Sequence, residues 1–147
     1  MEYTTGSHTT YYLTYHIVWC TKYRYQLLTG EVAMRARELI RQIADRNEVR
    51  IVKGHVSRDH IHILVSIPPR LAIARFIQYV KGASSHKLFQ EFSHLKKRYW
   101  GQHLWARGYF VTTVGNINED QIARYIENQD MKPKREDDFQ ISTDFSP

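Results

Sequence analysis

The chain has 147 residues, the usual size of one domain, and its content of 42% hydrophobic and 24% charged residues argues against disorder. Lys and Arg outnumber Asp and Glu by 21 to 15, giving a net charge of +6, and one cysteine, Cys20, excludes a disulfide scaffold or a cysteine-rich zinc site. No apolar run suits a membrane span and residues 1–10 are too polar for a signal peptide, so we expect a cytoplasmic protein.

The first half of the chain predicts a strand, a helix and a hairpin. Residues 11–24 are rich in β-branched and aromatic side chains that alternate, which indicates a strand. Thr29 can cap a helix whose apolar stripe runs from Val32 to Ile43 at helical spacing. Residues 49–56 and 60–67 are predicted strands, and the short link between them implies an antiparallel hairpin.

The second half predicts a long helix, a loop, a short strand and a final helix. Pro68 and Pro69 end the preceding strand, and residues 71–92 have helical periodicity. Residues 93–108 are expected to form a loop, and residues 109–114 a fourth strand. Asn118 and Gln121 form a capping-box pattern at the start of the last helix.

This order predicts an α+β protein with a ferredoxin-like βαββαβ fold, in which one antiparallel sheet carries its helices on one face. The additional C-terminal helix carries Tyr125. We expect one domain over residues 1–131 and an exposed tail over residues 132–147. Because many functions use this fold, it does not by itself identify an activity.

Positive charge is concentrated in one stretch, residues 70–107, where Glu91 is the only acidic residue. The basic residues there are Arg70, Arg75, Lys81, Lys87, Lys96, Lys97, Arg98 and Arg107, interleaved with Tyr79, Tyr99, Trp100 and Trp105. Cations beside stacking aromatics favour nucleic acid as the partner. A solvated helix face over core aromatics would give the same pattern. We select Arg75, Lys81 and Lys87 as candidate nucleic-acid contacts.

The sharpest local motif is His60-Ile61-His62 within a predicted strand. Alternate side chains of a strand share a face, so both imidazoles project together while Ile61 enters the core. Two imidazoles on one face suit a divalent metal. Two partly exposed histidines that pair with neighbours are the alternative interpretation.

The last helix contributes Tyr125 and, one turn later, Gln129 on the same edge of its apolar stripe. Tyrosines at such edges usually pack with the hydroxyl in water, and such glutamines are often surface residues. Beside a metal ligand, however, a tyrosine hydroxyl can attack a phosphodiester while the metal polarises the phosphate.

Other chemistries find little support. The sequence lacks a glycine-rich phosphate loop, so no nucleotide cofactor is expected, and it lacks a nucleophile-elbow serine. Cys20 is interpreted as a core residue. His16 could face the polar side of the sheet, but the sequence assigns it no role.

Taken together, the motifs resemble the single-tyrosine transposases of the smallest insertion sequences, which belong to the histidine-hydrophobic-histidine (HUH) endonucleases. The resemblance covers residues 11–130 and depends on the joint order of its blocks. These blocks are Tyr15–Arg24 (YHIVWCTKYR), Asp59–Val65 (DHIHILV), Lys81–Ser85 (KGASS), Leu104–Phe110 (LWARGYF) and Tyr125–Gln129 (YIENQ).

The resemblance implies a mechanism and its site. His60, His62 and Gln129 would bind Mg or Mn, and Tyr125 would attack single-stranded DNA to leave a 5′-phosphotyrosine and a 3′ hydroxyl. It further implies a homodimer, hairpins recognised near the element ends, and no other cofactor. Alternatives are a domesticated repeat-associated tyrosine transposase, a hairpin-binding module that does not cut, and a metal-dependent phosphodiesterase with water as the nucleophile.

Overall fold

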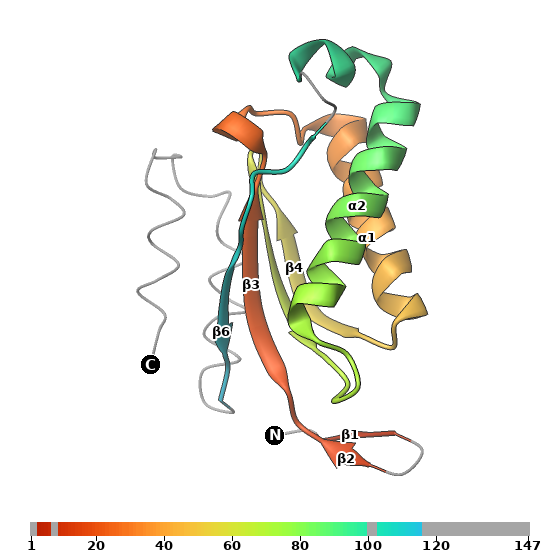
Figure 1. Cartoon of the computed structure of the whole chain (residues 1–147), viewed down its shortest axis with the longest axis vertical. Coiled ribbons are helices and arrows are strands. Elements are labelled where there is room, and N and C mark those ends of the chain that lie inside the picture. The colour runs from red at the N-terminus through yellow and green to blue at the C-terminus, as the bar shows by residue number, and fades with distance from the viewer. Residues whose placement is uncertain (1–2, 7–8, 100–102, 116–147) are drawn as a thin grey trace.

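The computed structural model describes residues 3–6, 9–99 and 103–115 (Figure 1). Its centre is a four-stranded sheet in the order β4–β5–β3–β6 with every neighbouring pair antiparallel. The strands are β3 (Thr14–Cys20), β4 (Arg50–Val56), β5 (His60–Ser66) and β6 (Phe110–Thr113). A small separate hairpin, β1 (Thr4–Thr5) with β2 (Thr10–Tyr11), precedes the sheet.

Both described α-helices, α1 (Gly30–Arg46) and α2 (Ile73–Glu91), lie on the same face of the sheet (Figure 1). With β5 placed between β4 and β3, this is the predicted ferredoxin-like arrangement. The predicted C-terminal helix, the tail and the domain boundary at residue 131 lie outside the described residues.

The core lies between the sheet and the two helices. Ile17 and Trp19 of β3 and Ile61, Ile63 and Val65 of β5 point toward the helices, as strand alternation predicts. The helices contribute Val32, Ala36, Leu39, Ile40 and Ile43 from α1, and Phe76, Ile77 and Val80 from α2. Burying one such large apolar side chain contributes about 1.5–3 kcal/mol, so this layer holds the sheet in place.

Two predictions about the irregular segments are wrong. The predicted strand over residues 11–24 is interrupted after Tyr11 and ends at Cys20, where the chain enters a short 3₁₀ turn, Lys22–Arg24. The Thr21 hydroxyl donates to the carbonyl of Tyr25 at 2.7 Å and closes this turn. Residues 93–98, predicted as loop, form a second 3₁₀ helix after α2.

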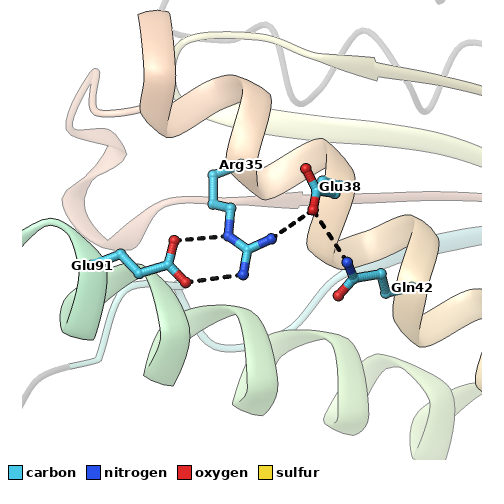
Figure 2. A network of polar contacts seen from close by, with 4 residues as sticks. All are labelled: Arg35, Glu38, Gln42 and Glu91. Carbon is cyan, nitrogen blue, oxygen red and sulfur yellow. Dashed lines mark hydrogen bonds and ion pairs between the residues drawn. The ribbon is translucent and has the colours of Figure 1, made fainter.

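Helices α1 and α2 are also joined by a polar network (Figure 2). The Arg35 guanidinium donates to both carboxylate oxygens of Glu91 at 2.8 and 2.9 Å, and to Glu38 at 2.8 Å. Thr29 precedes α1 as predicted, but its side chain makes no capping hydrogen bond. None of the helices in the described ranges is sufficiently long and apolar to cross a membrane, and the expected cytoplasmic location stays a prediction.

Candidate metal and nucleic-acid site

His60 and His62 lie on the sheet face opposite the helices. In the strand register, His60 is opposite Cys20 of β3, and His62 is opposite Val18 of β3 and His55 of β4. The two imidazoles meet edge to face with ring centroids 4.7 Å apart. Both side chains are fully buried, so the interpretation as partly exposed histidines is wrong.

His60 is oriented by the residue that precedes it. Its Nδ1 lies 2.7 Å from Oδ1 of Asp59, and Oδ2 of Asp59 lies 3.2 Å from Nη2 of Arg24. A carboxylate on Nδ1 selects the tautomer with a proton there, which makes Nε2 the basic nitrogen and orients the ring. Arg24, in the Lys22–Arg24 turn, balances the charge of the buried Asp59 carboxylate.

His62 has a corresponding neighbour in His16, which the sequence left unassigned. Nε2 of His16 lies 3.2 Å from Nδ1 of His62, and the rings stack with centroids 5.4 Å apart and planes 12° apart. Burial lowers the pKa of His16 to about 4, so its imidazole is neutral at physiological pH. Nε2 of a neutral His16 can accept a hydrogen bond from Nδ1–H of His62, which again leaves Nε2 of His62 as the nitrogen with a free lone pair.

These residues fit part of a divalent metal site. Both imidazoles are contacted at Nδ1 by a second side chain, which is the arrangement that metal-bound histidines usually show. Two nitrogen donors are fewer than a divalent ion takes. Across residues 3–6, 9–99 and 103–115 no cluster of three or more His, Cys, Asp or Glu could hold a metal ion. Further donors therefore have to come from elsewhere, and the predicted residues Tyr125 and Gln129 lie outside the described residues.

The structure separates the three candidate nucleic-acid contacts. Arg75 and Lys87 are exposed on α2, in the helix layer, on the other side of the sheet from the two histidines. Lys81 is half-buried, and its ammonium donates to the carbonyls of Ala106 and Gly108 at 2.9 and 2.6 Å. Burial lowers the pKa of Lys81.

Lys81 lines one side of a groove of about 750 Å³ between α2 and residues 103–108. Its other polar lining includes Ser85, His86, Lys96, His103 and Arg107. Of the residues that line the groove, Lys81, Lys96 and Arg107 are among the basic residues identified in the sequence. The groove therefore brings three of those basic residues together, whereas Arg75 lines a different groove, against α1.

The chain is similar to known transposases over most of its length. Residues 9–129 match the family model described as "Transposase IS200 like". The ISDra2 transposase TnpA of Deinococcus radiodurans is 41% identical over 119 residues, covering 81% of this chain and 85% of that protein. The transposase of insertion sequence element IS200 from Salmonella typhimurium is 37% identical over 141 residues, covering 96% and 92% respectively.

Solved structures show the same fold. A Deinococcus radiodurans crystal structure described as a transposase has a TM-score of 0.70 and 40% identity, and the match covers 86% of this chain and 97% of that one. A REP-associated tyrosine transposase bound to a REP hairpin has a TM-score of 0.61 over 86% of this chain and 73% of that one. At 18% identity, this second match shows the fold alone.

Proposed function

Since the chain belongs to the IS200-like transposase family, we propose that it cleaves and rejoins single-stranded DNA through a 5′-phosphotyrosine on Tyr125. The observation that carries the proposal is the pair of buried imidazoles, His60 and His62, each contacted at Nδ1 by a second side chain. Gln129, one helical turn after Tyr125, would complete the metal site.

The proposed reaction balances without water or a nucleotide. The Tyr125 hydroxyl oxygen bonds to the scissile phosphorus, the bond from phosphorus to O3′ breaks, and the tyrosine proton ends on the released 3′ hydroxyl. A 3′ hydroxyl later attacks the phosphotyrosine, which rejoins the strand and restores Tyr125. A bound Mg or Mn ion would polarise the phosphate and offset the negative charge that develops on its oxygens.

The described residues have defined tasks in this proposal. Asp59 and His16 hold His60 and His62 in the tautomer whose Nε2 can ligate a metal. Arg24 pairs with the Asp59 carboxylate and holds it in place beside His60. The apolar side chains on the other face of β5 fix the strand itself, so the two imidazoles are positioned before DNA arrives.

The proposed substrate is single-stranded DNA that folds into hairpins near the ends of an insertion sequence, and the proposed assembly is a homodimer. Hairpin recognition is supported by the fold shared with a REP-associated transposase bound to a REP hairpin. The two insertion-sequence transposases are 41% and 37% identical to this chain against 18% for that protein, which favours a mobile element over a repeat-associated copy.

The test compares the wild-type protein with Tyr125→Phe on single-stranded oligonucleotides tiled across the DNA that flanks the gene. With Mg or Mn we expect a covalent protein–DNA adduct on denaturing gels for wild type, and none for Tyr125→Phe or with chelator. Tyr79→Phe, an exposed tyrosine of α2, is the matched control and should cut normally. Cutting by Tyr125→Phe would instead indicate water as the nucleophile, and hairpin binding without any adduct would indicate a binding module.

A further inference from the structure

The Lys22–Arg24 turn holds an exposed aromatic ring in an unusual backbone conformation. Tyr23 and Arg24 have φ angles of 63° and 52°, in the left-handed region that side chains other than glycine rarely adopt. Such a conformation costs on the order of 1 kcal/mol or more per residue and persists only where the surroundings enforce it. It leaves the ring of Tyr23 67% exposed.

Backbone hydrogen bonds to two distant segments, and one within the turn itself, enforce this conformation. Lys22 N donates to the carbonyl of Leu104 at 2.8 Å, and Thr21 N to that of Asp59 at 2.9 Å. Arg24 N donates to the carbonyl of Thr21 at 2.9 Å, within the turn. The exposed ring therefore stands on a backbone that is fixed from several sides.

One face of the Tyr23 ring packs against a second tyrosine. It stacks on Tyr99, with centroids 6.3 Å apart and planes 24° apart. Tyr99 is itself buried, and its hydroxyl donates to the carbonyl of Lys22 at 2.9 Å. Burial raises the pKa of Tyr99 to about 12, so this donor keeps its proton over the working pH range. Tyr23 is thus an ordered ring rather than a loosely attached one.

Cations lie near this ring and its aromatic neighbour Tyr25. Nζ of Lys22 lies 5.3 Å from the Tyr23 centroid, and the guanidinium of Arg98 lies 4.3 Å from the centroid of Tyr25, a ring that also contacts Tyr23. Lys96, Lys97 and Arg98 are exposed on the neighbouring 3₁₀ helix. An exposed aromatic ring among cations is the combination that binds single-stranded nucleic acid, because bases stack on the ring and phosphates meet the charges.

The turn is also attached to the candidate metal site. Arg24, the residue after Tyr23, contacts Asp59, and Asp59 contacts Nδ1 of His60. The ring therefore lies at the end of the sheet where His60 begins β5. We propose that Tyr23 is a stacking platform for one base of the single-stranded DNA whose phosphate is cut at the histidine pair. This inference rests on the proposed function.

The test uses the flanking oligonucleotide that wild-type protein binds most tightly, with a single abasic site moved along it one position at a time. Removing a base that stacks on Tyr23 should weaken binding by wild type and by Tyr23→Phe about 5- to 100-fold at one position. Tyr23→Ala should bind the intact strand weaker by a similar factor, and the abasic site at that position should have no further effect.

Two variants control for folding and for general aromatic contact. Tyr23→Asn removes the ring but suits a positive φ, so it should repeat the result of Tyr23→Ala in a backbone without added strain. Tyr3→Ala removes a ring that is 64% exposed in the β1–β2 hairpin and should bind like wild type. If Tyr23→Ala and Tyr23→Asn bind single-stranded DNA as tightly as wild type does, Tyr23 is not a stacking platform, and the proposed function still stands. If the wild-type protein binds none of the single-stranded oligonucleotides, both the platform and the proposed function are contradicted.

Discussion

At the scale of single residues, the site depends on which nitrogen of each histidine is contacted. His60 and His62 are contacted at Nδ1, one by the carboxylate of Asp59 and the other by the neutral imidazole of His16. The carboxylate is the stronger hydrogen-bond acceptor, so His60 should be held more firmly in its orientation than His62. His16 is too deeply buried to carry a charge, and it would orient His62 without adding a cation beside the metal.

This difference predicts the effect of removing the His16 acceptor. His16→Phe keeps a ring stacked on His62 but loses the nitrogen, so Mn²⁺ affinity measured by titration calorimetry should fall about 10-fold. His62→Ala should lose a ligand and show a larger decrease. The control, His86→Phe, changes an exposed histidine of α2 and should bind Mn²⁺ like wild type. Equal affinity of His16→Phe and wild type would show that His16 only fills space.

At the scale of elements, α1 and α2 are joined by apolar packing and by the bidentate pair of Arg35 and Glu91 (Figure 2). The hydrogen bond from Arg35 is the main cause that lowers the pKa of Glu91 below its ordinary value of 4.5. Since the pKa of Glu91 is lowered in the folded protein, the pair stabilises the fold at pH values above the ordinary pKa of 4.5. The stabilisation is lost as the pH falls through the folded pKa.

The pair therefore predicts a pH-dependent effect of Arg35→Gln. Urea unfolding at pH 7 should show a modest loss of stability relative to wild type, because the pair is on the surface and screened by solvent. At pH 3 the difference between the two proteins should shrink. Arg37→Gln, at an exposed position of the same helix, is the control for removing one positive charge. A difference that stays the same at both pH values would assign the effect of Arg35 to packing alone.

At the scale of the whole molecule, the sheet divides two kinds of surface. One face carries the helices and the exposed Arg75 and Lys87, while the other carries His60 and His62. A DNA strand that is cut at the histidine pair would have to pass around the sheet to reach Arg75 and Lys87. Lys81 is on the same helix, but its ammonium is hydrogen-bonded to the carbonyls of residues 106 and 108.

Whether DNA reaches the helix layer can be tested at Lys87, which is exposed on α2. Lys87→Gln should weaken binding and reduce the slope of log K against log salt by about 0.7, the value for one phosphate contact in a single strand. Arg41→Gln removes an equal charge from an exposed position of α1 and should leave the slope unchanged. Equal slopes for Lys87→Gln and wild type would mean that this part of the basic stretch is only solvated. Lys81→Gln is less informative, because it also removes two internal hydrogen bonds.

Local periodicity in the sequence was sufficient to predict the order of the four sheet strands and the two described α-helices, and the shared face of His60 and His62. The reason is that strand alternation and helical spacing depend on neighbouring residues alone. The same rule placed Ile61 and Ile63 in the core, where the structure has them. The short link between β4 and β5 permits only a hairpin, so the antiparallel pairing could also be predicted.

Only the tertiary structure decided what those histidines contact. His16 and His62 are 46 residues apart, and they meet because of the register in which β3 and β5 pair. A shift of that register by one residue would turn one of the two side chains to the other face of the sheet. The left-handed turn that exposes Tyr23 depends on hydrogen bonds that Lys22 N and Thr21 N donate to the carbonyls of Leu104 and Asp59, which lie far away in the sequence. Such contacts depend on how strands and loops pack together, so they cannot be predicted from local side-chain patterns.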